Sequence, residues 1–580
     1  MEINKITTGD YKIFTVFALF WIFLAWLGFL SALVGFFYSW IFIGYFILEI
    51  AGTIYVFRKK IFNKPSGEFC IAALVFLAIV ILFSSFTIPT IFSGRDQGSI
   101  SEAGIRLAQN HQLKFSTPAS QEFFKIYGPG KALNFPGFHY AQSGELITQF
   151  PIPYIAWLGI FYSVFGLAGL IIANAVLFYL FLFSAYLLFR LFAPIKYSVI
   201  FLLLLLISFS FSWFLKFTLS ENMALALIWL GILQLVLFFK EKSNLYFFSF
   251  LTTLGLMAFT RIEGVALLTM LIIIMLFNKS ARNFLAADKV KRIFFPVFIF
   301  VVIFILNFIV NFSFFREIGK ALLKNSTQTV EVSSIINTAN ILLVYGIVPY
   351  LIFGIIGIVY FIKRKTRLEF LPLVLVFPLL FYLADPHISS DHPWMLRRYV
   401  FAILPLFIFY TVLWLAYYFR NKKRWLLSVI LAILFLLNIT ASLKYFTFSE
   451  NKNLLEQTKI LSQNFSTNDL ILVDRLASGD GWSMLSGPMS FLHGKNTVYF
   501  FNPNDLSKIN LEKFDKIYLI APDEKISFYE SSILKSRLNF CKDYQIETLR
   551  LKVFDKNEKN ILLPEKKIIK IEGKIFEVRN

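Results

Sequence analysis

The sequence is poor in cysteine and in charge. Only two cysteines, Cys70 and Cys541, occur among 580 residues, which excludes a disulfide framework and a cysteine-based metal site. Charged residues make up 16% of the chain, against roughly 25% in soluble globular proteins. Hydrophobic residues make up 57%, and long apolar segments recur from Tyr11 to about Tyr445. These segments predict a polytopic α-helical membrane protein.

A glycine-rich phosphate loop is also missing. The glycines of "ASGDGWSMLSG" (477–487) have the wrong spacing for a dinucleotide-binding fingerprint. The net charge of +21 could indicate a nucleic-acid partner, but its distribution argues against one. Residues 1–446 carry 36 Lys and Arg against 17 Asp and Glu, whereas residues 447–580 carry 20 against 18. The excess lies in short loops between apolar runs, which is typical of membrane topology and not of nucleic-acid binding.

The positive charges also predict how the chain crosses the membrane. Downstream of residue 166, one alternate set of loops carries 17 Lys and Arg residues and the other set carries 7, so the first set is expected to be cytoplasmic. This assignment agrees with the basic cluster at 58–64 only if the run 150–166, "FPIPYIAWLGIFYSVFG", does not cross the bilayer. We interpret that short, proline-led run as an interfacial or re-entrant helix. The apolar runs lie at about 11–31, 35–57, 69–92, 150–166, 167–191, 197–217, 222–240, 245–261, 264–278, 293–314, 339–362, 369–384, 399–419 and 425–446.

Thirteen spans therefore remain, in a multi-pass protein of the cell membrane with a cytoplasmic N-terminus. The predicted domains are two N-terminal transmembrane helices (1–68), a transmembrane module (69–446) with a large outer loop (93–166), and an extracytoplasmic α/β domain (447–580). In the last of these, "DLILVD" (469–474), "NTVYFF" (496–501) and "KIYLIAP" (516–522) are typical of short buried strands. "IIKIEGKIFEV" is predicted to close the chain as a hairpin around Glu572 and Gly573.

Charged and polar side chains gather where the predicted loops meet the outer face. Ionisable groups at membrane depth are costly and usually face a bundle interior or an aqueous cavity. Arginine matches the oxygens of a phosphate, and a nearby carboxylate can take a proton from an attacking hydroxyl or amine. The convergence of both groups favours transfer from a lipid phosphate. The residues are Arg95, Asp96, Glu102, Glu221, Arg261, Glu263, Arg397, Arg398 and Tyr399.

Several short motifs resemble one family. A charged Asp96 after an early span, a long outer loop and the proline-rich "QFPIPYIAWLGIFYSVFG" are similar to the GT-C superfamily of integral membrane glycosyltransferases. That superfamily includes protein O-mannosyltransferases and the aminoarabinose transferase of lipid A. "TRIEG" (260–264) and "RRYVFAILP" (397–405) resemble further segments of it, and the resemblance covers about residues 69–446. The tyrosine usual after the aspartate is missing, because the chain reads "DQGSISEAG" there, with Ile100 and Ser101.

The resemblance implies a glycosyltransferase that takes a hexose or pentose from a polyprenyl-phosphate donor and passes it to an acceptor at the outer face. It implies that Asp96 is the catalytic carboxylate and that Arg397 or Arg398 binds the donor phosphate. From the residues themselves, Glu221 and Glu102 are the alternatives to Asp96 as the base. Arg261 is a further phosphate ligand, and Arg95, Glu102, Glu263 and Tyr399 are expected to bind substrate. Direct displacement predicts inversion at the anomeric carbon. The sequence does not identify the sugar or whether the acceptor is a protein, a lipid or a glycan.

Two alternatives remain open from the sequence. "DPHISSDH" offers Asp385, His387, Asp391 and His392 as ligands for a divalent metal, although the expected reaction requires no cofactor. A transporter or flippase for a lipid-linked or anionic substrate would also need charge within the membrane. Transporters, however, often carry inverted repeats and helices broken at the midplane, and these charges gather at one face. The sequence therefore favours an enzyme.

Overall fold

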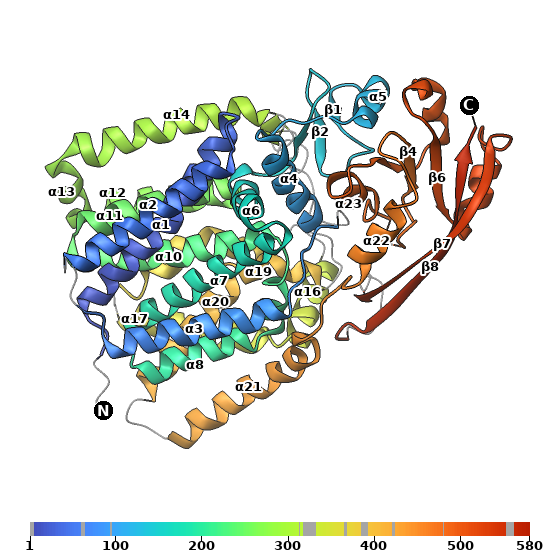
Figure 1. Cartoon of the computed structure of the whole chain (residues 1–580). Coiled ribbons are helices and arrows are strands. Elements are labelled where there is room, and N and C mark those ends of the chain that lie inside the picture. Colours follow the sequence, from blue (N-terminus) through green and yellow to red (C-terminus); the bar gives the residue numbers. More distant parts are fainter. Residues whose placement is uncertain are drawn as a thin grey trace.

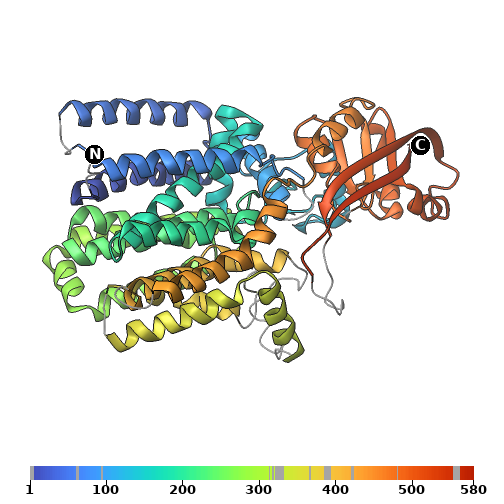
Figure 2. The same ribbon diagram turned by 90° about the horizontal axis from the view of Figure 1, so that it is seen from below.

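The computed structural model describes residues 5–59, 64–92, 96–312, 314–316, 319, 332–364, 368–383, 393–419, 424–479, 481–552 and 562–579. A helical bundle forms one part of the molecule, and a domain built around a sheet lies at one end of that bundle (Figure 1). The N-terminus lies at the opposite end of the bundle, as Figures 1 and 2 both show. The two ends of the chain therefore lie on opposite sides of the bundle.

The bundle is built from helices of very different length and exposure. Its central helix is α10, whose most apolar window is 94% buried, whereas the corresponding window around α14 is 11% buried. Long apolar helices with exposed side chains are expected where the surrounding medium is lipid. The bundle elements are α1 (Thr8–Leu33), α2 (Ser39–Arg58), α3 (Gly67–Ser85), α6 (Ile152–Phe165), α7 (Leu167–Arg190), α8 (Ile195–Leu206), α9 (Phe209–Phe214), α10 (Ser220–Glu241), α11 (Asn244–Thr260), α12 (Glu263–Phe277), α13 (Lys279–Ala287), η1 (Val290–Phe294), α14 (Phe295–Val310), α16 (Val332–Val344), α17 (Val348–Arg364), α18 (Leu371–Val376), η3 (Phe377–Leu383), η4 (Trp394–Leu396), α19 (Arg397–Val400), α20 (Ile403–Tyr418) and α21 (Arg424–Phe446).

The helices confirm a multi-pass membrane protein. Among the described residues, six helices are long and apolar enough to cross a membrane, or nine if each of three bent helix pairs forms one span. The bent pairs join α12 to α13, the end of α16 to α17, and η4–α19 to α20. Other apolar helices have only 10–17 residues, below the roughly 20 that a straight span needs. The predicted count of thirteen spans is not confirmed.

Helix α6 covers the run that we interpreted as interfacial or re-entrant. It has 14 residues, which at about 1.5 Å per residue is shorter than a hydrocarbon core of roughly 30 Å. The side chains of its first ten residues, from Ile152 to Phe161, are all buried in the protein. It packs against α1 and α7 and against helix α4 (Asp96–Asn110). Its length agrees with a helix that does not span, and its position relative to the membrane stays a prediction.

The third predicted span ends earlier than the apolar run. Helix α3 stops at Ser85, and residues 86–92 follow without helical structure, so the run does not continue as a helix to Phe92. Pro89 explains this end, because proline disfavours a helical conformation in the residue before it and lacks the backbone N–H that a helix uses. Asp96 is consequently the first residue of the next helix, α4, and not the last residue of a span.

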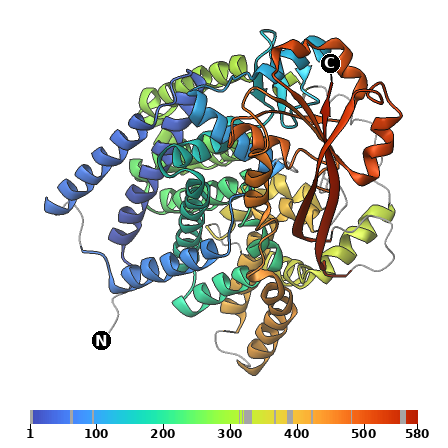
Figure 3. The same cartoon turned by 45° about the vertical axis from the view of Figure 1, so that its right-hand side comes forward.

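The outer loop is a small folded unit between the bundle and the C-terminal domain (Figure 3). It begins with α4 and continues through a short helix and a three-stranded antiparallel sheet to α6. Helix α4 packs closely on α6, and Gly104 and Gly159 are the contact points where any side chain would meet the facing backbone. The remaining elements are α5 (Pro118–Tyr127), β1 (Gly130–Lys131), β2 (Phe138–Tyr140) and β3 (Leu146–Thr148).

The C-terminal region is an α/β domain, as predicted. Its five-stranded sheet has the order β5-β4-β6-β8-β7, in which β4 runs parallel to β5 and β6 while β8 runs antiparallel to β6 and β7. The three short strands expected from the sequence are β4, β5 and β6. The elements are α22 (Leu454–Ser462), β4 (Leu470–Asp474), α23 (Ser486–Phe491), β5 (Asn496–Phe500), η5 (Pro503–Lys508), η6 (Leu511–Lys513), β6 (Ile517–Pro522), α24 (Asp523–Glu530), β7 (Leu538–Leu551) and β8 (Lys566–Val578).

The predicted hairpin around Glu572 and Gly573 is wrong. Both residues lie inside one continuous strand, β8, which pairs with β6 on one side and with β7 on the other. A side chain at Gly573 would meet the Ala521 carbonyl oxygen at 2.4 Å and the Tyr544 ring at 2.6 Å. The glycine is therefore needed for the close approach of neighbouring strands and does not mark a turn.

The outer loop and the C-terminal domain are joined by buried polar contacts. Glu122 of α5 accepts a hydrogen bond from the backbone N–H of Asn510 at 3.0 Å and forms an ion pair with Lys513 at 2.7 Å. The Tyr127 hydroxyl donates to Asp505 at 2.6 Å. These contacts fix the domain against the end of the bundle where the charged residues lie.

Candidate functional site

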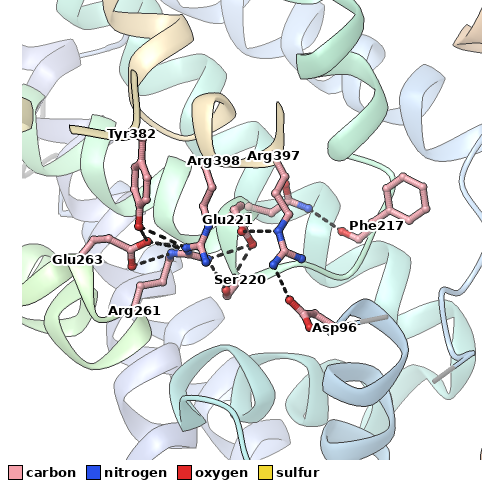
Figure 4. A network of polar contacts seen from close by, with 10 residues as sticks. Asp96, Phe217, Ser220, Glu221, Arg261, Glu263, Tyr382, Arg397 and Arg398 are labelled. Atoms are coloured by element: carbon pink, nitrogen blue, oxygen red, sulfur yellow. Dashed lines mark hydrogen bonds and ion pairs between the residues drawn. The ribbon is translucent and has the colours of Figure 1, made fainter. Parts of the chain in front are cut away.

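Six ionisable side chains from four segments form one network at the end of the bundle nearest the C-terminal domain (Figure 4). Three are carboxylates and three are guanidinium groups, so the network is balanced in charge. Charges buried in this way are stable only when each has an opposite partner and good hydrogen bonds. The six residues are Asp96, Glu221, Glu263, Arg261, Arg397 and Arg398.

Each carboxylate stands in the first turn of a helix. Asp96 begins α4, Glu221 is in the first turn of α10, and Glu263 begins α12. The N-terminal end of a helix carries a partial positive charge and free backbone N–H groups, and both favour an acidic side chain there. The sequence therefore places negative charge at the ends of three helices that converge on the same point.

The tight turn between α11 and α12 holds two members of the network together. Only Arg261 and Ile262 separate the two helices. A side chain at Gly264 would meet the Met257 carbonyl oxygen at 2.1 Å, so the absence of one lets α12 start directly against the last turn of α11. The tight turn formed by "RIEG" thus places the side chains of Arg261 and Glu263 in the network.

Arg261 is the buried centre of the site. Its Nη1 lies 3.0 Å from Oε2 of Glu221 and donates to the Ser220 hydroxyl at 2.8 Å. Its Nη2 lies 2.8 Å from Oε1 of Glu263. The whole residue is 7% exposed. Arg261 thus ties two carboxylates together, and this position suits a structural role better than direct contact with a phosphate.

Arg397 links this buried centre to the accessible edge. Its Nη2 lies 2.6 Å from Oδ2 of Asp96, and its Nε lies 3.6 Å from Oε1 of Glu221. The Asp96 side chain is 41% exposed, whereas that of Glu221 is 4% exposed. Of these two carboxylates, Asp96 is the one that a substrate can reach.

Arg398, the neighbour of Arg397, pairs with a different carboxylate of the network. Its Nη1 lies 2.6 Å from Oε1 of Glu263, which also accepts a hydrogen bond from the Tyr382 hydroxyl. The side chains of Arg397 and Arg398 are 13% and 19% exposed, so both guanidinium groups are partly accessible. A phosphate oxygen is the ligand that fits such groups best.

The fold that carries this network is found in proteins of known structure. Two crystal structures of ArnT from Cupriavidus metallidurans superimpose on 86% of this chain and 97% of their own, each with 11% sequence identity. One is the apo state, with a TM-score of 0.53, and the other is bound to undecaprenyl phosphate, with a TM-score of 0.54. The chain has the ArnT fold. This agrees with the fold that the resemblance of the short motifs implied. No protein-family model and no curated protein sequence matches the chain.

On this ArnT-like fold, most of the residues singled out in the sequence come together. Asp96, Glu221, Arg261, Glu263, Arg397 and Arg398 lie in one network. Arg95 lies outside the described residues, as do all four candidate metal ligands: Asp385, His387, Asp391 and His392. Among the described residues, no group of three or more His, Cys, Asp or Glu could hold a metal ion.

Two expected substrate ligands have other contacts. Glu102 follows Asp96 by six residues along α4 and pairs with Arg106 at 3.7 Å. It faces a small cavity against the C-terminal domain that Ser483 and Ser490 also line, so it lies away from the network. Tyr399 is fully buried, and its hydroxyl donates to the Tyr382 carbonyl oxygen at 2.9 Å. Tyr399 therefore supports the segment that carries the arginines.

Tyr382 and Ser220 belong to the network but were not expected from the sequence. Ser220 directly precedes Glu221, so the polar pair at the start of an apolar run was an available signal. Tyr382 stands in an apolar stretch, "LVFPLLFYLAD", where nothing distinguishes it from a membrane-interface aromatic residue. Its role appears only once the fold brings η3 next to α12.

Proposed function

We propose that the protein is a glycosyltransferase that moves a hexose or pentose from a polyprenyl-phosphate donor to an acceptor at the outer face of the membrane. The observation that carries the proposal is the pairing of the exposed Asp96 with Arg397, beside Arg398, where the apolar bundle meets the C-terminal domain. A membrane-bound donor has its phosphate at this boundary and its apolar tail among helices. The ArnT fold, seen in one case with undecaprenyl phosphate bound, supports the same substrate class.

In the proposed reaction, Arg397 and Arg398 bind the donor phosphate. An acceptor hydroxyl or amine attacks the anomeric carbon of the sugar, and Asp96 takes the proton that it loses. The bond between the anomeric carbon and the phosphate oxygen breaks, and its electron pair leaves with the polyprenyl phosphate. The arginines stabilise the negative charge that develops on this leaving group. A single displacement of this kind inverts the anomeric configuration.

Arg397 cannot hold both the phosphate and Asp96 in the same way. Its Nη2 is the atom that contacts Asp96, so a bound phosphate competes with the carboxylate for that guanidinium group. We infer that donor binding loosens the Asp96–Arg397 pair and leaves the carboxylate available as a general base. Glu221 stays between Arg261 and Arg397 throughout and keeps the arginines in position. The guanidinium groups supply the positive charge that stabilises the leaving phosphate, so the proposal needs no metal.

The orientation in the membrane follows from the same proposal. The C-terminal domain lies at the end of the bundle that carries the network (Figure 1). We propose that both are extracytoplasmic and that the N-terminus is cytoplasmic. The excess of Lys and Arg in alternate loops supports this orientation.

Release of polyprenyl phosphate tests the function. Purified protein in nanodiscs is incubated with a set of undecaprenyl-phosphate-linked hexoses and pentoses and with a cell-envelope extract that supplies acceptors, and free undecaprenyl phosphate is measured by mass spectrometry. We expect release from at least one donor, and release by Asp96→Asn that is slower by about 10²–10⁴-fold. Movement of an intact donor across vesicle membranes without any release would instead indicate a transporter.

A further inference from the structure

A cavity of about 300 Å³ lies between the bundle and the C-terminal domain. Its volume is at the lower end of the roughly 300–1,000 Å³ usual for small-ligand sites. Residues of the bundle line one wall and residues of the domain line the other. The bundle wall is Ile88, Thr90, Phe92, Gln97, Phe217 and Trp394. The domain wall is Glu450, Asn451, Met484, Arg550, Leu551, Lys552, Lys567 and Ile569.

The cavity adjoins the charged network. Gln97 directly follows Asp96, and Trp394 lies three residues before Arg397. Asp96 and Arg397 do not line the cavity themselves, so it lies beside the network, on the side of the C-terminal domain.

The domain wall is basic. Its ionisable side chains are three bases, Arg550, Lys552 and Lys567, and one acid, Glu450. In the β7–β8 ribbon, Arg550 stands directly opposite Lys567. Because side chains alternate between the two faces of a strand, Arg550, Lys567 and Ile569 share one face of the ribbon, and Lys552 directly follows the end of β7. Positive charge is thus concentrated on one face of one ribbon.

One end of the β7–β8 ribbon is directed toward the bundle (Figure 1), and contacts hold this end in place. Arg550 donates through Nε to Asn451 at 2.8 Å, and the Leu551 backbone N–H donates to Glu450 at 2.9 Å. The segment that precedes these partners is itself fixed, because Lys216 donates to the carbonyl oxygen of Phe448 at 2.9 Å. Arg550 is held by these contacts, and Lys552 and Lys567 are exposed residues at the edge of the cavity.

The bundle wall suits a sugar or another small polar ring. The rings of Phe217 and Trp394 lie 5.1 Å apart and form an aromatic corner. Gln97 supplies an amide close to Asp96. Aromatic surface with a few polar groups is the usual composition of a small-ligand site.

We propose that this cavity is the acceptor site and that the acceptor carries a phosphate or carboxylate group, which Lys552 and Lys567 bind. The inference rests on the proposed function. The anionic group is the anchor and is not the nucleophile: the ribbon holds it at the domain wall, and a hydroxyl or amine of the same molecule reaches Asp96. The domain thereby selects acidic acceptors over neutral ones.

Binding of small probes to the full-length protein tests this. The protein is placed in nanodiscs of neutral lipid, and its affinity is measured for glucose 6-phosphate, for glucose and for a short-chain phosphatidic acid. The variants are Lys552→Gln with Lys567→Gln, and Lys570→Gln as a matched control. Lys570 lies on the opposite face of β8 and pairs with Glu572 at 2.8 Å.

We expect a phosphate probe to bind at least about 10-fold more tightly than glucose, as for one charge-assisted hydrogen bond. The double variant should lose this preference, Lys570→Gln should keep it, and added salt should weaken it. A preference for glucose 6-phosphate identifies a glycan as the source of the anion, and a preference for phosphatidic acid identifies a lipid headgroup.

Equal binding of glucose and both phosphate probes, or an equal loss in the Lys570→Gln control, would overturn the inference. Binding of undecaprenyl phosphate, measured on the same samples, separates this failure from failure of the proposed function. If undecaprenyl phosphate binds and no phosphate probe is preferred, only the acceptor inference is wrong. If undecaprenyl phosphate does not bind either, the proposed function is wrong as well.

Discussion

Nη2 of Arg397 lies 2.6 Å from Oδ2 of Asp96, although one residue begins the outer loop and the other stands at the start of a late apolar helix pair. The pair joins the exposed edge of the network to its buried centre, because Arg397 also faces Glu221. Asp96 can leave this partner and remain solvated, whereas Glu221 would be left buried beside two arginines. The geometry therefore divides the carboxylates into one that can react and others that hold the arginines.

The two neighbouring arginines should determine affinity for the donor phosphate. We expect Arg397→Ala and Arg398→Ala each to weaken binding of undecaprenyl phosphate by about 10- to 100-fold, the effect of losing one hydrogen bond to a charged group. Arg282→Ala is the control, since Arg282 is an exposed arginine of α13, outside the network. Unchanged affinity in the Arg397→Ala/Arg398→Ala double variant would discard the assignment.

Glu263 should matter for stability more than for chemistry. It accepts charge-assisted contacts from Arg261 and Arg398, at 2.8 and 2.6 Å, and a hydrogen bond from Tyr382. Glu263→Gln leaves two guanidinium groups without full compensation, and breaking a buried pair costs about 3–5 kcal/mol. Thermal unfolding in detergent measures this as a lower melting temperature. The surface variant Glu530→Gln should melt like the wild type, and equal melting of both variants would contradict the structural role.

The contact between the outer loop and the C-terminal domain should weaken in acid. Burial alone would raise the pKa of Glu122, but hydrogen bonds from Lys125, Lys513 and the Asn510 N–H outweigh it and lower the pKa to about 2. The unfolded carboxyl binds its proton first, near its ordinary value of about 4.5. The stabilisation is therefore complete above about pH 4.5 and is lost as the pH falls toward 2.

Comparison of the wild type with Glu122→Gln measures this loss. The difference in melting temperature between the two proteins should be constant from pH 7 to about pH 5 and should shrink as the pH falls further. A difference that does not change down to pH 3 would contradict the assignment to Glu122.

The two native cysteines can report the topology without new substitutions. Cys541 is exposed on β7 of the C-terminal domain, and Cys70 is exposed near the start of α3. If the domain is extracytoplasmic, a membrane-impermeant maleimide should label Cys541 in intact cells, and Cys541→Ser should abolish labelling. Labelling of Cys541 only after the cells are broken would reverse the proposed orientation.

The sequence was informative about the site because buried charge is rare in a membrane protein. Arg261, Glu263 and Arg397 each interrupt apolar runs, and the cost of isolated charge there implies partners. The pairing itself was not predictable. That Arg261 bridges two carboxylates, and that Glu102 turns toward Arg106 instead, depends on how α4, α10 and α12 converge.

The fold was predictable where the hydrophobic pattern of the sequence alone determines the type of element. Apolar runs indicate membrane helices, and short apolar segments between polar stretches indicate the buried strands β4, β5 and β6. The end of α3 and the path of β8 were not predicted correctly. An apolar run does not show where Pro89 breaks it, and Gly573 fits a turn as well as a close strand contact until its neighbours are known.

The most direct test of the proposed chemistry is the turnover of Asp96→Asn, measured as undecaprenyl phosphate released from the lipid-linked sugar that the wild type uses. General-base assistance is worth about 10²–10⁴-fold in rate, so turnover should fall by roughly that factor. Affinity for undecaprenyl phosphate should be retained or increased, because the amide competes less for Arg397 than the carboxylate does. Near-normal turnover of Asp96→Asn in correctly folded protein, together with complete loss in Glu221→Gln, would make Glu221 the base and contradict the account.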